Sequence, residues 1–107
     1  HVRDRKSLVI IRGGGNVYPA EIERVLHDLP EVEACAVVGI PDERLGERVA
    51  VAVQLREGAT VGEEELRAHC FANLARYKVP ERWLFVDAFP RNSMGKIQRR
   101  ELPALFT

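Results

Sequence analysis

The sequence has little cysteine, few aromatic residues and no net charge, and each shortage excludes a class of protein. Its 107 residues include two cysteines and 7% aromatics, and sixteen basic residues balance sixteen acidic ones. Cys35 and Cys70 lie in apolar periodic segments, which favours reduced, buried thiols over a disulfide framework. The balanced charge gives no overall field that would draw nucleic acid or an anionic membrane to the chain. Any attraction for an anion must be local.

Long apolar runs are missing too. No stretch approaches the roughly 20 residues that a membrane span requires, and no signal peptide opens the sequence. We therefore expect a protein of the cytoplasm with no transmembrane segment. The sequence begins at His1 rather than Met, inside a charged stretch that resembles an interior linker. We expect it to be part of a longer protein.

Signatures of metal sites and covalent catalysis are also absent. The histidines and cysteines share no metal-ligand spacing, and Ser93 lies in no nucleophile elbow. The Gly95-Lys96 pair lacks a glycine five positions earlier and a Ser or Thr after it, so it is not a Walker phosphate loop. The triple glycine at 13–15 does not match the dinucleotide fingerprint.

The apolar pattern predicts one small α+β domain, with helices packed on a mostly antiparallel sheet that is preceded by a β-hairpin. We expect a hairpin over 8–18 with a glycine-rich turn, a helix over 19–28, strands over 32–40 and 49–55, a helix over 61–75, a strand over 83–86 and a short helix over 98–102. The continuous apolar run at 32–40 predicts a central strand covered on both faces.

The expected second helix has its own start signal and inner stripe. Thr60 and Glu63 have the spacing of a capping box. Its predicted inner stripe consists of Leu66, Cys70 and Leu74. Phe71 is expected to lie alongside this stripe. Pro103 should interrupt the terminal helix.

Lys96 is the candidate catalytic residue. Gly95 before it removes side-chain bulk and permits a positive φ, so the lysine could be presented on a tight loop as a movable point charge. The alternative is a solvated surface lysine beside Arg91, Arg99 and Arg100. The glycines at 13–15 have two interpretations as well: a permissive turn, or a place where a ligand lies against the backbone.

Four segments together resemble motifs of the acyl-CoA synthetases, members of the adenylate-forming enzyme superfamily. Residues 4–23 (DRKSLVIIRGGGNVYPAEIE) resemble the hinge and pantetheine loop. Residues 37–42 (VVGIPD), 77–80 (YKVP) and 91–96 (RNSMGK) resemble three further motifs, in the right order. The resemblance covers the whole chain and implies a mobile carboxy-terminal domain over 1–107, without the large amino-terminal domain.

That resemblance implies a two-step reaction. A carboxylic acid, expected to be a fatty acid, reacts with MgATP to give an acyl-adenylate and pyrophosphate, and the CoA thiol then displaces AMP. The lysine at position 96 serves the first step, where positive charge stabilises the developing negative charge. After a domain rotation, the loop at Gly13 and Gly14 lines the pantetheine channel. ATP and Mg contacts are expected mainly from the amino-terminal domain, so residues 1–107 alone should be inactive.

The resemblance assigns three further residues. Arg5 matches an arginine near the nucleotide ribose, and Ser7 falls at the hinge. Tyr77 matches an aromatic that lies near the CoA nucleotide in some members, although core packing accounts for it equally well. The hinge departs from the family pattern, which has Asp or Lys followed by an acidic residue, whereas this chain has Ser7 and Leu8.

Two other functions remain as alternatives. An adenylation domain that loads the phosphopantetheine of a carrier protein would use the same loops. A ferredoxin-like module could instead bind RNA or another ligand without catalysis, because helix-strand-strand-helix-strand is part of that pattern. An RNA-recognition sheet would present aromatics on its central strands, and the 49–55 strand has none. We therefore expect no nucleic-acid partner.

Overall fold

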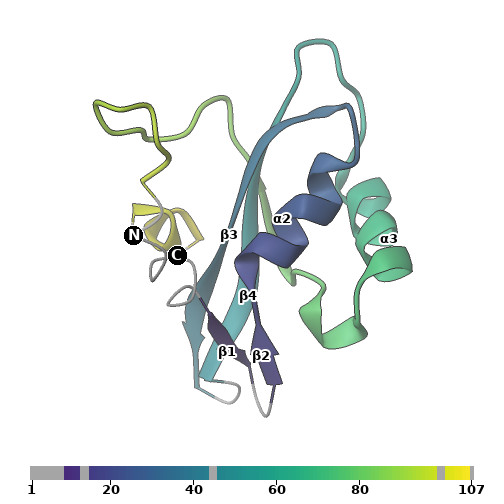
Figure 1. The fold of residues 1–107 in the computed structure, drawn as a ribbon, viewed down its shortest axis with the longest axis vertical. Coiled ribbons are helices and arrows are strands. Elements are labelled where there is room, and N and C mark those ends of the chain that lie inside the picture. The colour runs from purple at the N-terminus through teal and green to yellow at the C-terminus, as the bar shows by residue number, and fades with distance from the viewer. Residues whose placement is uncertain (1–8, 13–14, 44–45, 99–100, 107) are drawn as a thin grey trace.

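A computed structural model describes residues 9–12, 15–43, 46–98 and 101–106. Helices pack on a single sheet, which confirms the predicted α+β class (Figure 1). In chain order the elements are β1 (Ile10–Arg12), β2 (Gly15–Val17), α2 (Pro19–His27), β3 (Val32–Asp42), β4 (Gly46–Leu55), α3 (Glu63–Asn73), the 3₁₀ turn η1 (Arg76–Lys78), β5 (Arg82–Phe85) and the 3₁₀ turn η3 (Pro103–Phe106). No helix among these residues is long and apolar enough to cross a membrane.

Strand β4 is the centre of the five-stranded sheet. It pairs antiparallel with β3 from Gly46, opposite Asp42, to Leu55, opposite Val32. Its other edge pairs with β1 at Gly46 and, in parallel, with β5 over residues 50–53. The sheet is mostly antiparallel, as predicted. The prediction that the 32–40 strand is central was wrong, because β3 lies at the sheet's edge. Its continuous apolar run reflects coverage of both faces rather than pairing of both edges.

Two apolar cores cover the two faces of the sheet. Alternate residues of a strand point to opposite faces, so Val49, Val51 and Val53 of β4 face the helices while Ala50 and Ala52 face away from them. The first core contains these valines and buried residues of α2 and α3, namely Ile22, Leu26, Leu66 and Cys70. The second core joins the alanines to Ala36, Val38, Ile40, Phe89, Leu102 and Phe106. Both cysteines are free and buried, as expected.

Helix α2 follows directly from the predicted hairpin. Strands β1 and β2 pair antiparallel with Ile10 opposite Val17, and β1 joins the hairpin to the main sheet. Pro19 then opens the helix, where its fixed φ suits the first helical position. Ile22 and Leu26, four residues apart on one helical face, are fully buried. These features were predicted, except that Gly15 belongs to β2 rather than to the turn.

Helix α3 begins later than predicted. Its first residue is Glu63, and the backbone N–H of Gly62 donates to Oε1 of Glu65 at 2.6 Å. The Thr60–Glu63 capping box was therefore wrong, because the helix uses the same spacing two residues further on. Phe71 was also misplaced: it is 50% exposed. It follows buried Cys70, and adjacent helical residues point about 100° apart.

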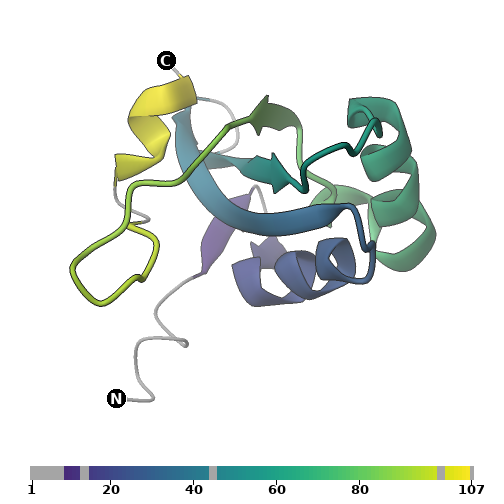
Figure 2. The same ribbon diagram turned by 90° about the horizontal axis from the view of Figure 1, so that it is seen from above.

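The carboxy-terminal segment crosses the second face of the sheet. The predicted helix over 98–102 is borne out only as a 3₁₀ turn that includes Glu101, whose N–H donates to the Gln98 carbonyl at 3.1 Å, and η3 then begins at Pro103. Leu102 is fully buried in the second core, and the following proline starts the turn instead of interrupting a helix. Figure 2 shows α2 and α3 on one side of the sheet, with η3 on the other and the loop before it projecting away from α3.

Candidate functional site

Lys96 lies near the end of a closed loop over residues 90–98. Arg91 and Ile97 form an isolated antiparallel bridge, and the Gln98 N–H donates to the Pro90 carbonyl at 2.8 Å. Ile97 is partly buried against the second core, whereas Lys96 is exposed. Successive residues of extended backbone point to opposite sides. The anchoring of Ile97 therefore directs Lys96 outward.

Gly95 gives this loop its turn. It has a φ of 85°, the left-handed region that side chains rarely adopt, and a Cβ there would meet no heavy atom within 4 Å. Conformation rather than crowding therefore favours glycine next to Lys96.

The side chains of Arg91 and Asn92 hold the same loop. Asn92 Oδ1 accepts hydrogen bonds from the backbone N–H groups of Met94 and Lys96, at 2.9 and 3.0 Å. Arg91 Nη1 donates to the Gly95 carbonyl at 2.8 Å. Sequence reasoning missed Asn92 and placed Arg91 only in a charge cluster. The signal was present, because asparagine commonly bonds the backbone two residues on in a turn.

Tyr77, on η1, packs over the end of the glycine-rich loop. A Cβ built on Gly15 would lie 2.8 Å from Tyr77 Cε1 and 3.2 Å from Cδ1. The Tyr77 side chain is 41% exposed, so it is not a core residue. The ring therefore covers the last of the three glycines, for which sequence analysis left open a permissive turn or a place where a ligand lies against the backbone.

A surface depression lies beside Tyr77. It has a volume of about 620 Å³ and is lined by Arg67, Phe71, Arg76, Tyr77 and residues 79–81. Two guanidinium groups and two exposed aromatic rings can attract an anion and stack against a planar ring. The depression thus has the chemical groups that a nucleotide needs.

An ion pair attaches η1 to α2. Lys78 Nζ donates to Glu21 Oε1 at 2.9 Å and lies 5.8 Å from the centroid of the Tyr77 ring. The hydrogen bond to Glu21 raises the pKa of Lys78, and partial burial opposes that rise. The contact fixes the backbone that carries Tyr77.

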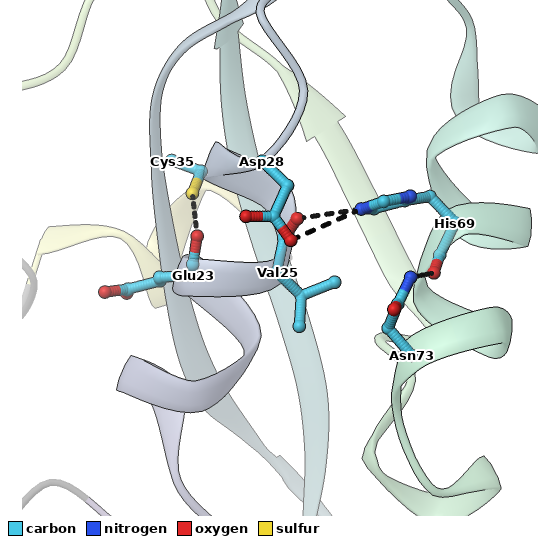
Figure 3. Close-up of polar contacts among 6 residues, drawn as sticks. All are labelled: Glu23, Val25, Asp28, Cys35, His69 and Asn73. Carbon is cyan, nitrogen blue, oxygen red and sulfur yellow. Dashed lines mark hydrogen bonds and ion pairs between the residues drawn. The ribbon is translucent and has the colours of Figure 1, made fainter.

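Helix α3, which carries Arg67 and Phe71, is fastened to the end of α2 (Figure 3). His69 Nε2 lies 3.0 Å from the Val25 carbonyl oxygen and 4.0 Å from Asp28 Oδ2. Cys70, the next residue, is fully buried, and that burial raises the pKa of its thiol to about 11. His69 and Cys70 do not line the depression. They attach α3, which does, to α2 and to the first core.

The lysine loop and the Tyr77 surface lie apart. In Figures 1 and 2 the loop before η3 projects on the side of the domain away from α3 and η1. Lys96 and Tyr77 are both among the described residues, but the structure does not bring their segments together. The other predicted site residues, Arg5, Ser7, Gly13 and Gly14, lie outside the described residues. Within the described ranges, no group of three or more His, Cys, Asp or Glu side chains could hold a metal ion.

Residues 21–96 match the family described as the AMP-binding enzyme C-terminal domain. That match covers most of the chain, and the chain belongs to this family.

Two of its curated relatives are named as CoA ligases. The chain is 50% identical over 105 residues to 2-succinylbenzoate–CoA ligase of Geobacillus kaustophilus, covering 98% of this chain and 21% of that protein. It is 44% identical over 102 residues to the long-chain-fatty-acid–CoA ligase FadD13 of Mycobacterium tuberculosis, covering 95% and 20%. The chain therefore spans about a fifth of the length of these relatives.

Solved structures agree with the sequence matches. Apo MatB from Rhodopseudomonas palustris superposes with a TM-score of 0.90 at 39% identity, over 95% of this chain and 20% of that one. The amide bond synthetase McbA from Marinactinospora thermotolerans superposes with a TM-score of 0.87, also at 39% identity, over 94% and 20%. The fold is therefore shared by an amide bond synthetase as well.

Proposed function

We propose that this chain is the mobile carboxy-terminal domain, over residues 1–107, of an acyl-CoA synthetase. The complete enzyme activates a carboxylic acid with ATP to an acyl-adenylate and transfers the acyl group to CoA. The observation that carries the proposal is the family match over 21–96, which ends at an exposed lysine on a constrained loop. The ligase relatives support the same class of reaction.

In the first step, Lys96 supplies positive charge. Attack of the substrate carboxylate on the α-phosphate of ATP gathers negative charge, and a preorganised cation lowers the energy of that state. Lysine suits the task because its ammonium is a compact charge on a long flexible stem. The exposed loop presents this charge to a partner surface, which we assign to an amino-terminal domain.

In the second step, the opposite surface faces the reaction. Gly13 and Gly14 line the channel for the pantetheine arm, where a side chain would narrow the passage. Tyr77 and the adjacent depression accept the CoA nucleotide, with Arg76 available for its phosphates and Arg67, which is paired with Glu63, beside it. Arg5 contacts the nucleotide ribose.

The separation of these surfaces supports a rotation between the steps. One bound acyl group cannot meet the lysine loop and η1 together, since these two segments lie on different sides of the domain (Figures 1 and 2). A rotation at Ser7 presents them in turn.

The remaining substrates and partners follow from the same proposal. ATP and Mg²⁺ are held mainly by the amino-terminal domain, and a fatty acid is the proposed carboxylic acid. CoA is favoured over a carrier-protein phosphopantetheine because the named relatives are CoA ligases. The enzyme acts in the cytoplasm and needs no nucleic acid.

The test separates the two half-reactions in the longer protein that contains this chain. Replacing Lys96 with Ala should reduce adenylate formation by roughly a hundredfold or more, the scale for losing one charge-stabilising group. Pyrophosphate exchange measures this step. Thioester formation from supplied acyl-adenylate should largely survive, because Lys96 faces away during that step.

Arg56→Ala is the matched control. Arg56 is an exposed cation paired with Glu33 at 2.8 Å, on neither proposed surface. Its loss should leave both half-reactions unchanged. Equal losses in both half-reactions of Lys96→Ala would contradict the assignment, as would acyl-adenylate synthesis by residues 1–107 alone.

A further inference from the structure

One residue binds both backbone polar groups of Lys96. Asn92 Oδ1 accepts from the Lys96 N–H at 3.0 Å, and the Asn92 N–H donates to the Lys96 carbonyl at 2.9 Å. The two bonds lie on either side of the Lys96 Cα. They fix the direction in which its side chain leaves the backbone.

The peptide group before Lys96 is held at both of its ends. Its N–H bonds to Asn92 Oδ1, and its carbonyl, which belongs to Gly95, accepts from Arg91 Nη1 at 2.8 Å. Asn92 Oδ1 also accepts from the Met94 N–H at 2.9 Å. Two consecutive side chains thus restrain a peptide that follows a glycine, where the backbone would otherwise be most free.

Apart from these bonds, the tip of the loop is closed by one backbone bond, from the Gly95 N–H to the Asn92 carbonyl at 2.9 Å. Residues 91–96 are exposed, and Met94 at the tip is 80% exposed. Apolar packing begins only at Ile97. In a segment with few buried contacts, local hydrogen bonds determine how ordered the backbone is. The Asn92 side chain is therefore placed to decide the order of the lysine loop.

We propose that Asn92 is a positioning residue for Lys96, and that the Arg91 guanidinium assists it by holding the Gly95 carbonyl. The inference rests on the proposed role of Lys96. A stem of four carbons multiplies a small rotation of the backbone into a large displacement of the ammonium. By fixing the Lys96 backbone in advance, Asn92 confines the charge to the directions useful for adenylation.

The first measurement tests the loop directly, by NMR amide hydrogen exchange in residues 1–107. Asn92→Ala should speed exchange at Met94 and Lys96 by roughly two- to tenfold, the factor for one lost hydrogen bond. The Val86 amide, bonded to Val53 in the sheet at 2.9 Å, should not change. Asn92→Asp keeps an acceptor oxygen and should restore protection.

Asn73→Ala provides a matched control. Asn73 is also exposed, and its Nδ2 donates to the His69 carbonyl at 2.8 Å on α3. Its removal should leave the amides of Met94 and Lys96 unchanged. Unchanged exchange at those two amides in Asn92→Ala would overturn the proposal. So would Asn92→Asp exchanging as fast as Asn92→Ala.

The second measurement uses the half-reactions of the longer protein. Asn92→Ala should lower kcat for adenylation about ten- to hundredfold, the range for misplacing a reacting group by about an ångström. KM should change little, and thioester formation should be retained. The Asn92→Ala, Lys96→Ala double variant should be no slower than Lys96→Ala alone, because Asn92 acts only through the lysine.

The outcomes separate this inference from the function on which it rests. If Lys96→Ala slows adenylation selectively but Asn92→Ala does not, the positioning role is wrong and the proposed function stands. Additive losses in the double variant would also refute positioning. If Lys96→Ala has no selective effect, the proposed function fails and the inference fails with it.

Discussion

The contact between Gly15 and Tyr77 makes the sharpest prediction about stability. Gly15 has no positive φ, so alanine is compatible with its backbone conformation. The obstacle is the Tyr77 ring, whose Cε1, Cδ1 and Cζ would lie 2.8, 3.2 and 3.3 Å from the new Cβ. A Cβ contact at 2.8 Å forces the ring to move. Replacing Gly15 with Ala should therefore displace Tyr77.

The expected cost follows from two opposing effects. Overpacking costs about 1–3 kcal/mol in a closed core, and the partly exposed ring places this site at about 1 kcal/mol or slightly more. Replacing glycine stabilises by about 0.4–1 kcal/mol through the unfolded chain. The net loss in Gly15→Ala should be about 0.5 kcal/mol. That loss corresponds to a Tm decrease of about 2–4 °C for a domain of this size.

A double-mutant cycle isolates the contact. In a Tyr77→Ala background the obstacle is gone, so Gly15→Ala should stabilise the domain by about 0.5 kcal/mol. The effect of the same substitution thus changes sign, and the coupling is about 1 kcal/mol. Urea unfolding of residues 1–107 and of its three variants at one pH measures all the terms. A near-zero coupling would refute the stacking of Tyr77 on Gly15.

Two further predictions use the same cooperative unfolding and half-reaction assays. Gly14→Leu should spare adenylation and block thioester formation, while Gly14→Ala should have a small effect on either step. If Gly14→Ala harms both steps equally and lowers stability, the glycine serves a strained turn and not a channel. Burial holds the pKa of Cys70 near 11 against an ordinary 9.0, so the unfolded thiol ionises first and stability should fall between about pH 9 and 11. Cys70→Ala should remove that part of the decline, and an identical pH profile in this variant would contradict it.

The fold was largely predictable because its elements carry local signals. Alternating valines predicted β4, and Pro19 with Ile22 and Leu26 predicted α2. The antiparallel pairing of β3 with β4 followed from the short connection between them. These signals depend on spacing along the chain, which the sequence displays directly.

The errors came from features that depend on tertiary contacts. An apolar run shows that both faces of β3 are covered, but not which strands lie beside it. The start of α3 depended on a choice between two acidic residues, Glu63 and Glu65, with the same capping spacing. The second turn of the terminal segment, η3, was not predicted, because it depends on the burial of Leu102 in the second core, which no local pattern reveals.

The candidate site also contains features that local sequence predicted and features that depend on tertiary contacts. Gly95 beside Lys96 predicted a tight turn, and its φ of 85° agrees. The covering of Gly15 by Tyr77 was not predictable, because 62 positions separate them and the ring arrives from another element. Asn92 could have been found from its turn chemistry, but an asparagine two residues after a proline draws less attention than a lysine after a glycine.

The attachment of the two surfaces explains how one small domain can serve two steps without conflict. The lysine loop is anchored through Ile97 to the second core, whereas Tyr77 is fixed through Lys78 and Glu21 to a helix of the first core. Strand β4 lies between these cores, and its inner residues are fully buried on both faces. Because the described residues attach the loop and the ring to different cores, each can be preorganised without restraining the other. Substitutions that disorder one surface should therefore leave the other half-reaction intact, and only damage to β4 itself should impair both.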